Sequence, residues 1–109
     1  MKTPFFLFLL VITLIACNKK EPVPCFESDK DDYRVGDVMH LISCSQHSDS
    51  LYWQIEKTFI LFTTVIYQVS YDQTVDVYIN GAGTYYVNLI AYSKNGNKSN
   101  KITRTYVIP

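Results

Sequence analysis

A strict alternation of side chains between Thr84 and Tyr92 constrains this chain more than any other feature. In an extended chain every second residue projects to the same side, so such a segment predicts a β-strand with two different faces. One face carries Tyr85, Val87, Leu89 and Ala91. The other face carries Tyr86, Asn88, Ile90 and Tyr92.

The rest of the chain after residue 24 carries the same β signal. It is rich in Tyr, Val, Ile, Thr and Phe, which fit a pleated surface, and turn-forming clusters at 45–50, 80–83 and 93–100 divide it. The strands expected between them are Cys25–Ser28, Val38–Cys44, Leu51–Lys57, Phe59–Val69, Thr74–Ile79, Thr84–Tyr92 and Lys101–Ile108. About seven short strands predict an all-β fold, a two-sheet sandwich. The region 58–71 is ambiguous: a central strand, two short strands joined by a bend, or an edge strand that needs cover.

The N-terminal segment is typical of an export signal. A short positive start at Lys2 precedes an apolar run over 4–13 that is too short for a permanent membrane span. The sequence Leu14-Ile15-Ala16-Cys17 then resembles the bacterial lipobox, which implies cleavage before Cys17 and lipidation of its thiol. The alternatives are an ordinary signal peptide, or an anchor helix with an incidental cysteine.

These features predict three regions: 1–16 as a lipoprotein signal peptide, 17–24 as the lipidated cysteine and a tether, and 25–109 as the folded domain. Pro22 and Pro24 discourage regular structure in the tether. Asn18 lacks the acidic side chain that resembles an inner-membrane retention signal, so we expect a lipid-anchored cell-envelope protein, in the outer membrane rather than the inner one. After removal of Lys2, nine basic and ten acidic residues remain, and no basic patch for nucleic acid is visible.

Two further cysteines, Cys25 and Cys44, are positioned for a disulfide. An exported chain meets an oxidising compartment, where such bonds persist. A hairpin with its turn between Arg34 and Val35 places the two cysteines opposite each other. Two free buried thiols are the alternative.

Several motifs resemble the PKD domain, an immunoglobulin-like β-sandwich. Val35-Gly36-Asp37 precedes the expected second strand, Leu51-Tyr52-Trp53 follows in the third, and Gly83-Thr84-Tyr85-Tyr86-Val87 lies near the end. The resemblance, to Bacteroidota lipoproteins of this type, covers most of 25–109. The stretch Gln54-Ile55-Glu56-Lys57 departs from the acidic, glycine-containing loop that the family carries after its tryptophan.

The resemblance implies roles for particular residues. Met39, Leu41 and Phe26 would face the core, whereas Cys25 and Cys44 would face outward. Trp53 is large enough to fill the space between two sheets. The Tyr85 hydroxyl would turn back to the backbone, and Gly81 and Gly83 would permit positive φ before the strand.

No catalytic or metal-binding constellation is evident. His40 is expected on the outward side of a strand and His47 in a loop, neither with a nucleophile at a diagnostic spacing. The acidic cluster Asp29, Asp31, Asp32 and Asp37 lacks the features of an EF-hand and is expected to be a solvated loop. We therefore expect no enzyme activity, no metal and no cofactor.

Tyrosines are in surplus for so small a core. The residues concerned are Tyr67, Tyr71, Tyr78, Tyr86 and Tyr92. Some must lie on the surface, where tyrosine suits protein or sugar contacts. The leading hypothesis is a non-catalytic, lipid-anchored binding or structural module that contacts an envelope protein or glycan. The alternative is a small inhibitor or immunity-type lipoprotein that blocks a partner protein; a small hydrolase is a weaker third.

Overall fold

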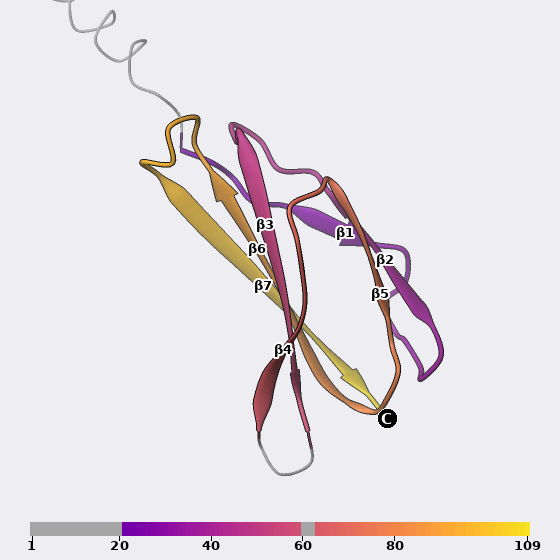
Figure 1. Ribbon diagram of the computed structural model, residues 1–109. Helices are drawn as coiled ribbons and strands as arrows, with labels where there is room; N and C mark the ends of the chain where they lie inside the picture. Colours follow the sequence, from indigo (N-terminus) through magenta and orange to yellow (C-terminus); the bar gives the residue numbers. More distant parts are fainter. Residues whose placement is uncertain (1–20, 60–62) are drawn as a thin grey trace, which may run out of the picture.

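The computed structural model describes residues 21–59 and 63–109, and all regular structure in these ranges is β (Figure 1). Residues 1–16 and Cys17, on which the signal-peptide and lipidation predictions rest, lie outside the described residues. The strands are β1 (Phe26–Ser28), β2 (Val38–Ser43), β3 (Ser50–Thr58), β4 (Thr64–Ser70), β5 (Thr74–Tyr78), β6 (Gly83–Tyr92) and β7 (Ser99–Ile108). The predicted all-β fold with two sheets is confirmed.

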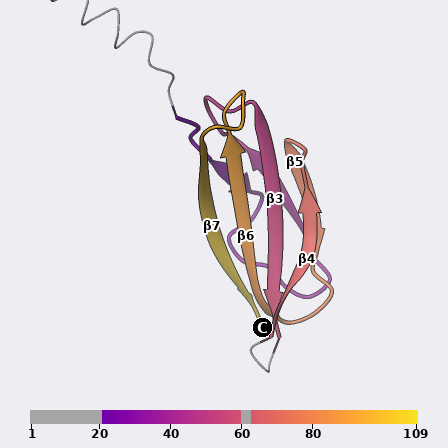
Figure 2. The ribbon, with the colours of Figure 1, turned by 60° about the vertical axis from the view of Figure 1, so that its left-hand side comes forward.

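The seven strands form two antiparallel sheets of order β1-β2-β5 and β4-β3-β6-β7. In Figure 2 the four strands of the larger sheet lie side by side, with the smaller sheet behind them. Strand β6 is the centre of this sheet, because its whole length pairs with β7 and nine of its residues pair with β3. The alternation between Thr84 and Tyr92 therefore belongs to the most completely paired strand.

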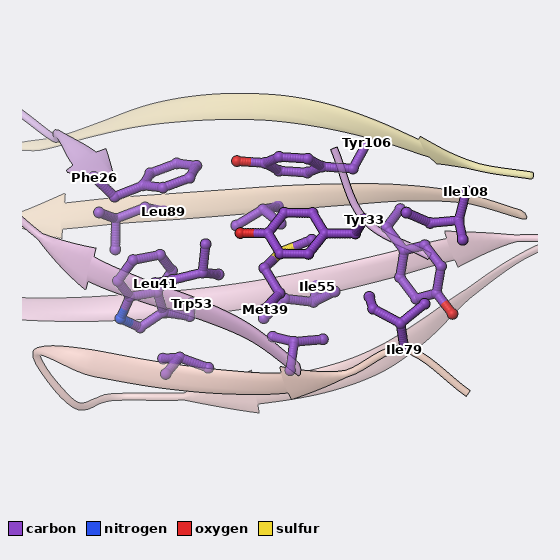
Figure 3. Packing of buried hydrophobic residues seen from close by; sticks show 14 of the residues in the cluster. Phe26, Tyr33, Met39, Leu41, Trp53, Ile55, Ile79, Leu89, Tyr106 and Ile108 are labelled. Carbon is purple, nitrogen blue, oxygen red and sulfur yellow. The ribbon is translucent and has the colours of Figure 1, made fainter. Parts of the chain in front are cut away.

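The core lies between the two sheets and takes alternate residues from both (Figure 3). Tyr85, Val87, Leu89 and Ala91 all face it and are buried. Met39, Leu41 and Phe26 are also buried there, as expected. Trp53 is fully buried, meets the ring of Phe26 edge-on at 5.3 Å, and donates its indole N–H to the carbonyl of Asp72 at 2.7 Å. The predicted core position of Trp53 is confirmed.

Tyr85 and Gly83 form the expected corner at the start of β6. The Tyr85 hydroxyl donates to the carbonyl of Gly81 at 2.8 Å. Gly83 has φ 144°, which side chains rarely adopt, and a Cβ atom there would lie 2.9 Å from the carbonyl oxygen of Thr58. Gly81 differs from the expectation, because its φ is not positive. Gly81 instead leaves room for the Lys57 side chain, since a Cβ atom there would lie 3.0 Å from the Nζ of Lys57.

The first hairpin has the predicted register. Phe26 pairs with Ser43, and the neighbouring Cys25 and Cys44 are joined by a disulfide, with their Cα atoms 4.9 Å apart. The expected turn is present: the Asp37 N–H donates to the Arg34 carbonyl at 3.0 Å. The predicted disulfide is therefore confirmed.

The predicted strand Phe59–Val69 is wrong. Strand β3 continues to Thr58, Phe59 already lies in the β3–β4 connection, and β4 begins at Thr64. β4 is an edge strand, one of the three alternatives for this region. Its pairing with β3 shifts register between Ile55 and Glu56, which leaves Tyr67 as an extra residue in a β-bulge.

The predicted tether is too long. Pro22 is fully buried, and Val23 exchanges two backbone hydrogen bonds with Gln46 at 2.8 and 3.0 Å. The side-chain amide of Asn100 donates to the Pro22 carbonyl at 2.7 Å. Proline disfavours strands and helices, which makes this segment resemble a linker in the sequence, but proline does not prevent packing. Among the described residues, packing against the sandwich therefore starts at Pro22, before Cys25.

Candidate functional site

The outer face of the four-stranded sheet is the largest candidate surface for binding. Residues that oppose each other across an antiparallel pair project to the same side, so the register defines this face. From β4 and the turn after it come Ile66, Val69 and Tyr71, which are 60%, 47% and 74% exposed. β3, β6 and β7 contribute Tyr52, Gln54, Glu56, Tyr86, Asn88, Ile90, Tyr92, Lys101, Thr103 and Thr105. No segment among the described residues lies over this face (Figure 2).

A row of polar side chains crosses the middle of this face, and these side chains form hydrogen bonds with one another. Asn88, only 5% exposed, donates to the Glu56 carboxylate at 2.7 Å and to the backbone carbonyl of Gln54 at 3.1 Å. The Thr103 hydroxyl donates to Asn88 Oδ1 at 2.6 Å. These bonds hold the side chains of three strands in fixed positions. The polar row can therefore be covered by a partner with little loss of hydrogen bonding.

The aromatic surplus divides into three groups. Tyr71 lies on the outer face beside Tyr52, with ring centroids 5.2 Å apart. Tyr86 and Tyr92 are half-buried on the same face. Tyr78 is 57% exposed on the other sheet, and Tyr67 turns inward against Tyr85, at 5.4 Å.

A hollow of about 460 Å³ lies on the outer face of the three-stranded sheet. His40 and Asp76 are cross-strand partners there, with the ring Nδ1 2.6 Å from a carboxylate oxygen. This hydrogen bond raises the pKa of His40 above its ordinary value of 6.5. Glu27 and Asp29 line the same hollow. His40 thus projects outward, as predicted.

Two of the four acidic residues in the cluster of the first hairpin, Asp29 and Asp37, have separate structural partners. Asp29 accepts hydrogen bonds from the Tyr33 hydroxyl at 2.6 Å and from the His40 N–H at 3.1 Å. The Tyr33 hydrogen bond lowers the pKa of Asp29, while burial and this carboxylate raise the pKa of Tyr33 to about 12. Asp37 accepts from the Arg34 N–H at 2.9 Å and lies 3.9 Å from the Lys30 ammonium.

No metal centre is formed by the described residues, since no three His, Cys, Asp or Glu side chains in 21–59 and 63–109 converge on one point. His47 lies in the β2–β3 connection with φ 55°. The Cys25 and Cys44 sulfurs are bonded to each other and do not act as nucleophiles or ligands.

Lys57 is a buried cation that sequence patterns did not indicate. Its side chain is on the core side of β3 and only 3% exposed. The ammonium lies 4.8, 5.6 and 5.0 Å from the ring centroids of Phe59, Tyr67 and Tyr85, and 3.3 Å from Asn80 Oδ1.

No protein-family model matches the chain, and a search of curated proteins finds no match either. Among the described residues, none forms a helix with the length and apolar character needed to traverse a lipid bilayer.

Proposed function

We propose that this protein is a non-catalytic, lipid-anchored binding module of the cell envelope, and that the outer face of its four-stranded sheet contacts a protein partner. The observation that carries this proposal is the uncovered row of Ile66, Val69 and Tyr71 along β4, next to Tyr52. Contiguous exposed apolar groups on a rigid sheet, with aromatic rings among them, are typical of interaction sites.

The internal hydrogen bonding of the face favours a protein partner over a sugar. Glycans are recognised through hydrogen bonds as well as ring stacking, and Asn88 and Thr103 already bond to each other, as do Asn88 and Glu56. The Tyr52–Tyr71 pair does offer two neighbouring aromatic rings, tilted by 41° to each other, on which a sugar could stack, so glycan binding is the second candidate.

We further propose the PKD-type immunoglobulin-like fold for residues 25–109. The order β1-β2-β5 and β4-β3-β6-β7 supports this assignment, because it places two facing sheets around a tryptophan in the third strand. The Tyr85 corner and the glycine turn before β2 support it too. In place of the family's loop after the tryptophan, this chain continues β3 to Thr58.

The anchoring proposal rests on the N-terminal sequence that ends in Ala16-Cys17, and the Cys25–Cys44 disulfide fits an oxidising compartment. Mass spectrometry of the protein purified from membranes tests it. We expect a chain that begins at Cys17 and carries acyl groups. A full-length chain with Met1 present and an unmodified Cys17 would contradict lipidation.

The binding face is tested by affinity capture from native envelopes with matched variants. The face variant Ile66→Thr/Val69→Thr/Tyr71→Thr keeps β-forming residues but removes the apolar row. The control Val38→Thr/Ile42→Thr/Tyr78→Thr changes three exposed apolar residues of the other sheet, which are 37%, 52% and 57% exposed.

We expect the wild type and the control to retain the same partner, and the face variant to retain about tenfold less, since buried apolar anchors dominate interfaces. If the face variant captured as much partner as the wild type, this face would be excluded as the binding site. Retention on immobilised glycans that is lost in Tyr71→Thr would assign the face to sugar instead of protein.

A further inference from the structure

The described chain enters the fold at one end of the sandwich, beside the β6–β7 turn (Figure 1). Three contacts hold it there: Pro22 accepts a hydrogen bond from Asn100 at 2.7 Å, and Val23 bonds twice to Gln46. Because Pro22 is also fully buried, this segment cannot pivot freely relative to the sheets.

The link between this end and Cys17 is short. Only residues 18–21 separate Cys17 from the buried Pro22. The five Cα–Cα steps from Cys17 to Pro22 span at most about 18 Å when fully extended. If Cys17 carries lipid, which is part of the proposed function, the end of the sandwich that contains Pro22 and the β6–β7 turn must stay beside the headgroups.

This end carries exposed lysines on the β6–β7 turn and at the start of β7. Within the turn the Ser93 N–H donates to the Lys98 carbonyl at 2.9 Å, the Gly96 N–H donates to the Ser93 carbonyl at 2.9 Å, and the Lys98 N–H donates to the Ser93 hydroxyl at 3.0 Å. Lys94, Lys98 and Lys101 are all exposed.

The composition of the turn suits contact with headgroups rather than insertion into hydrocarbon. The turn and the first three residues of β7, 93–101, contain only Ser, Lys, Asn and Gly, so this segment has no apolar side chain to enter the bilayer. Acidic residues are absent from the sequence after Asp76. Two carboxylates, Glu21 and Asp49, belong to segments that adjoin the turn. Against them stand the three lysines, so the surface is basic by one charge.

We propose that Lys94, Lys98 and Lys101 form a docking surface for anionic phospholipid headgroups. Each basic residue close to an anionic bilayer strengthens the association about fivefold. The anchor already confines the domain to the bilayer, so this attraction need only orient it. The strands then stand away from the membrane with the β6–β7 turn against the lipid. Apart from Lys101 at its end nearest the bilayer, the outer face of the four-stranded sheet remains open sideways to partners.

A lipid-coupled domain tests this proposal independently of lipidation in the cell. All buried residues of the described chain lie between Pro22 and Ile108, so residues 17–109 contain the complete core. With the Cys25–Cys44 disulfide intact, Cys17 is the free thiol and couples to a maleimide phospholipid in vesicles. The vesicles contain phosphatidylcholine alone or mixed with phosphatidylglycerol.

The acetylation rate of each lysine by an uncharged reagent, measured by mass spectrometry, shows whether that lysine lies against the lipid. Lys30 is the internal control, because it lines a hollow with Val107 and Pro109 at the opposite end of β7. On anionic vesicles we expect Lys94, Lys98 and Lys101 to react at least about threefold more slowly than on neutral vesicles, with Lys30 unchanged, and high salt to remove the difference. Equal protection of Lys30, or no protection of the three lysines, overturns the proposal.

Amide hydrogen exchange over residues 93–101 shows whether the lysines themselves cause the contact with lipid, or whether the short link alone keeps this segment near the bilayer. The wild type should be protected on anionic vesicles, and Lys94→Gln/Lys98→Gln/Lys101→Gln should not. The control Lys30→Gln/Arg34→Gln should remain protected. Protection that persists in the triple variant contradicts the assigned lysines. Because the maleimide supplies the anchor, these outcomes are distinct from the mass-spectrometric result on Cys17.

Discussion

Gly36 and Gly83 both have positive φ, at 97° and 144°, but their surroundings differ. A Cβ atom at Gly36 would meet nothing within 4 Å, whereas one at Gly83 would lie 2.9 Å from the Thr58 carbonyl oxygen. We expect Gly36→Ala to lower the free energy of unfolding by about 1 kcal/mol, from backbone strain alone. Gly83→Ala should cost about 3 kcal/mol, because strain and a backbone clash combine. Urea unfolding of both variants measures this difference.

The comparison is internally controlled, since each variant adds the same methyl group. Similar losses in the two variants would show that the β3–β6 pairing relaxes around Gly83 at little cost. That result would also weaken the structural importance given to the corner formed by Gly83 and Tyr85.

At the residue scale, alternation along a strand predicts well which side chains face the core. It predicts less well which polar or charged side chains are buried. It correctly grouped Tyr85 with its core neighbours, and the hairpin register correctly brought Cys25 to Cys44. It did not indicate that Lys57 is buried, since three aromatic rings from separate segments form its site. Nor did it indicate that Asn88 is buried on the outer face, which depends on Glu56 and Thr103 from two other strands. Both depend on contacts between strands, which periodicity within one strand does not contain.

At the scale of the element, β2 and β5 share a titratable cross-strand pair. The hydrogen bond that the His40 ring donates to the Asp76 carboxylate raises the pKa of His40, so folding is favoured by protonation of this ring. The resulting stability is fully present below the ordinary pKa of about 6.5 and is lost as pH rises through the higher folded value. We expect His40→Gln to lower the thermal midpoint at pH about 5.5 and to change it little at pH about 9. A pH-independent effect would show that packing, not charge, is responsible.

The bulge in β4 explains why the region 58–71 could not be predicted as one element. Tyr67 and Gln68 both turn toward β5: the Tyr67 hydroxyl donates to the Tyr78 carbonyl at 2.5 Å and the Gln68 amide to the Asp76 carbonyl at 3.0 Å. The extra residue Tyr67 breaks the alternation along β4, so the sequence of this region places large side chains on both faces of a regular strand. The bulge has no local sequence signature, because it is set by where β3 and β5 lie.

At the scale of the whole molecule, the two sides where the sheets meet are closed differently. On one side, Tyr33 and Tyr106 meet edge-on at 5.7 Å, and the Arg104 guanidinium lies 4.6 Å from the ring centroid of Phe26. On the other side, Tyr67 and Gln68 bond directly to the backbone of β5, the edge strand of the smaller sheet. Those carbonyls would otherwise be free to pair with another chain.

Removal of these two side-chain groups should therefore cause self-association. In Tyr67→Phe/Gln68→Ala, the Asp76 and Tyr78 carbonyls lose their partners, and a strand of a second copy can take their place. We expect light scattering to show a mass that rises with protein concentration, while the wild type does not change. The control Tyr78→Phe/Gln73→Ala removes the same functional groups from exposed positions and should behave as the wild type. A variant that unfolds more readily but keeps a constant mass would show that the bulge stabilises the sandwich without protecting its edge.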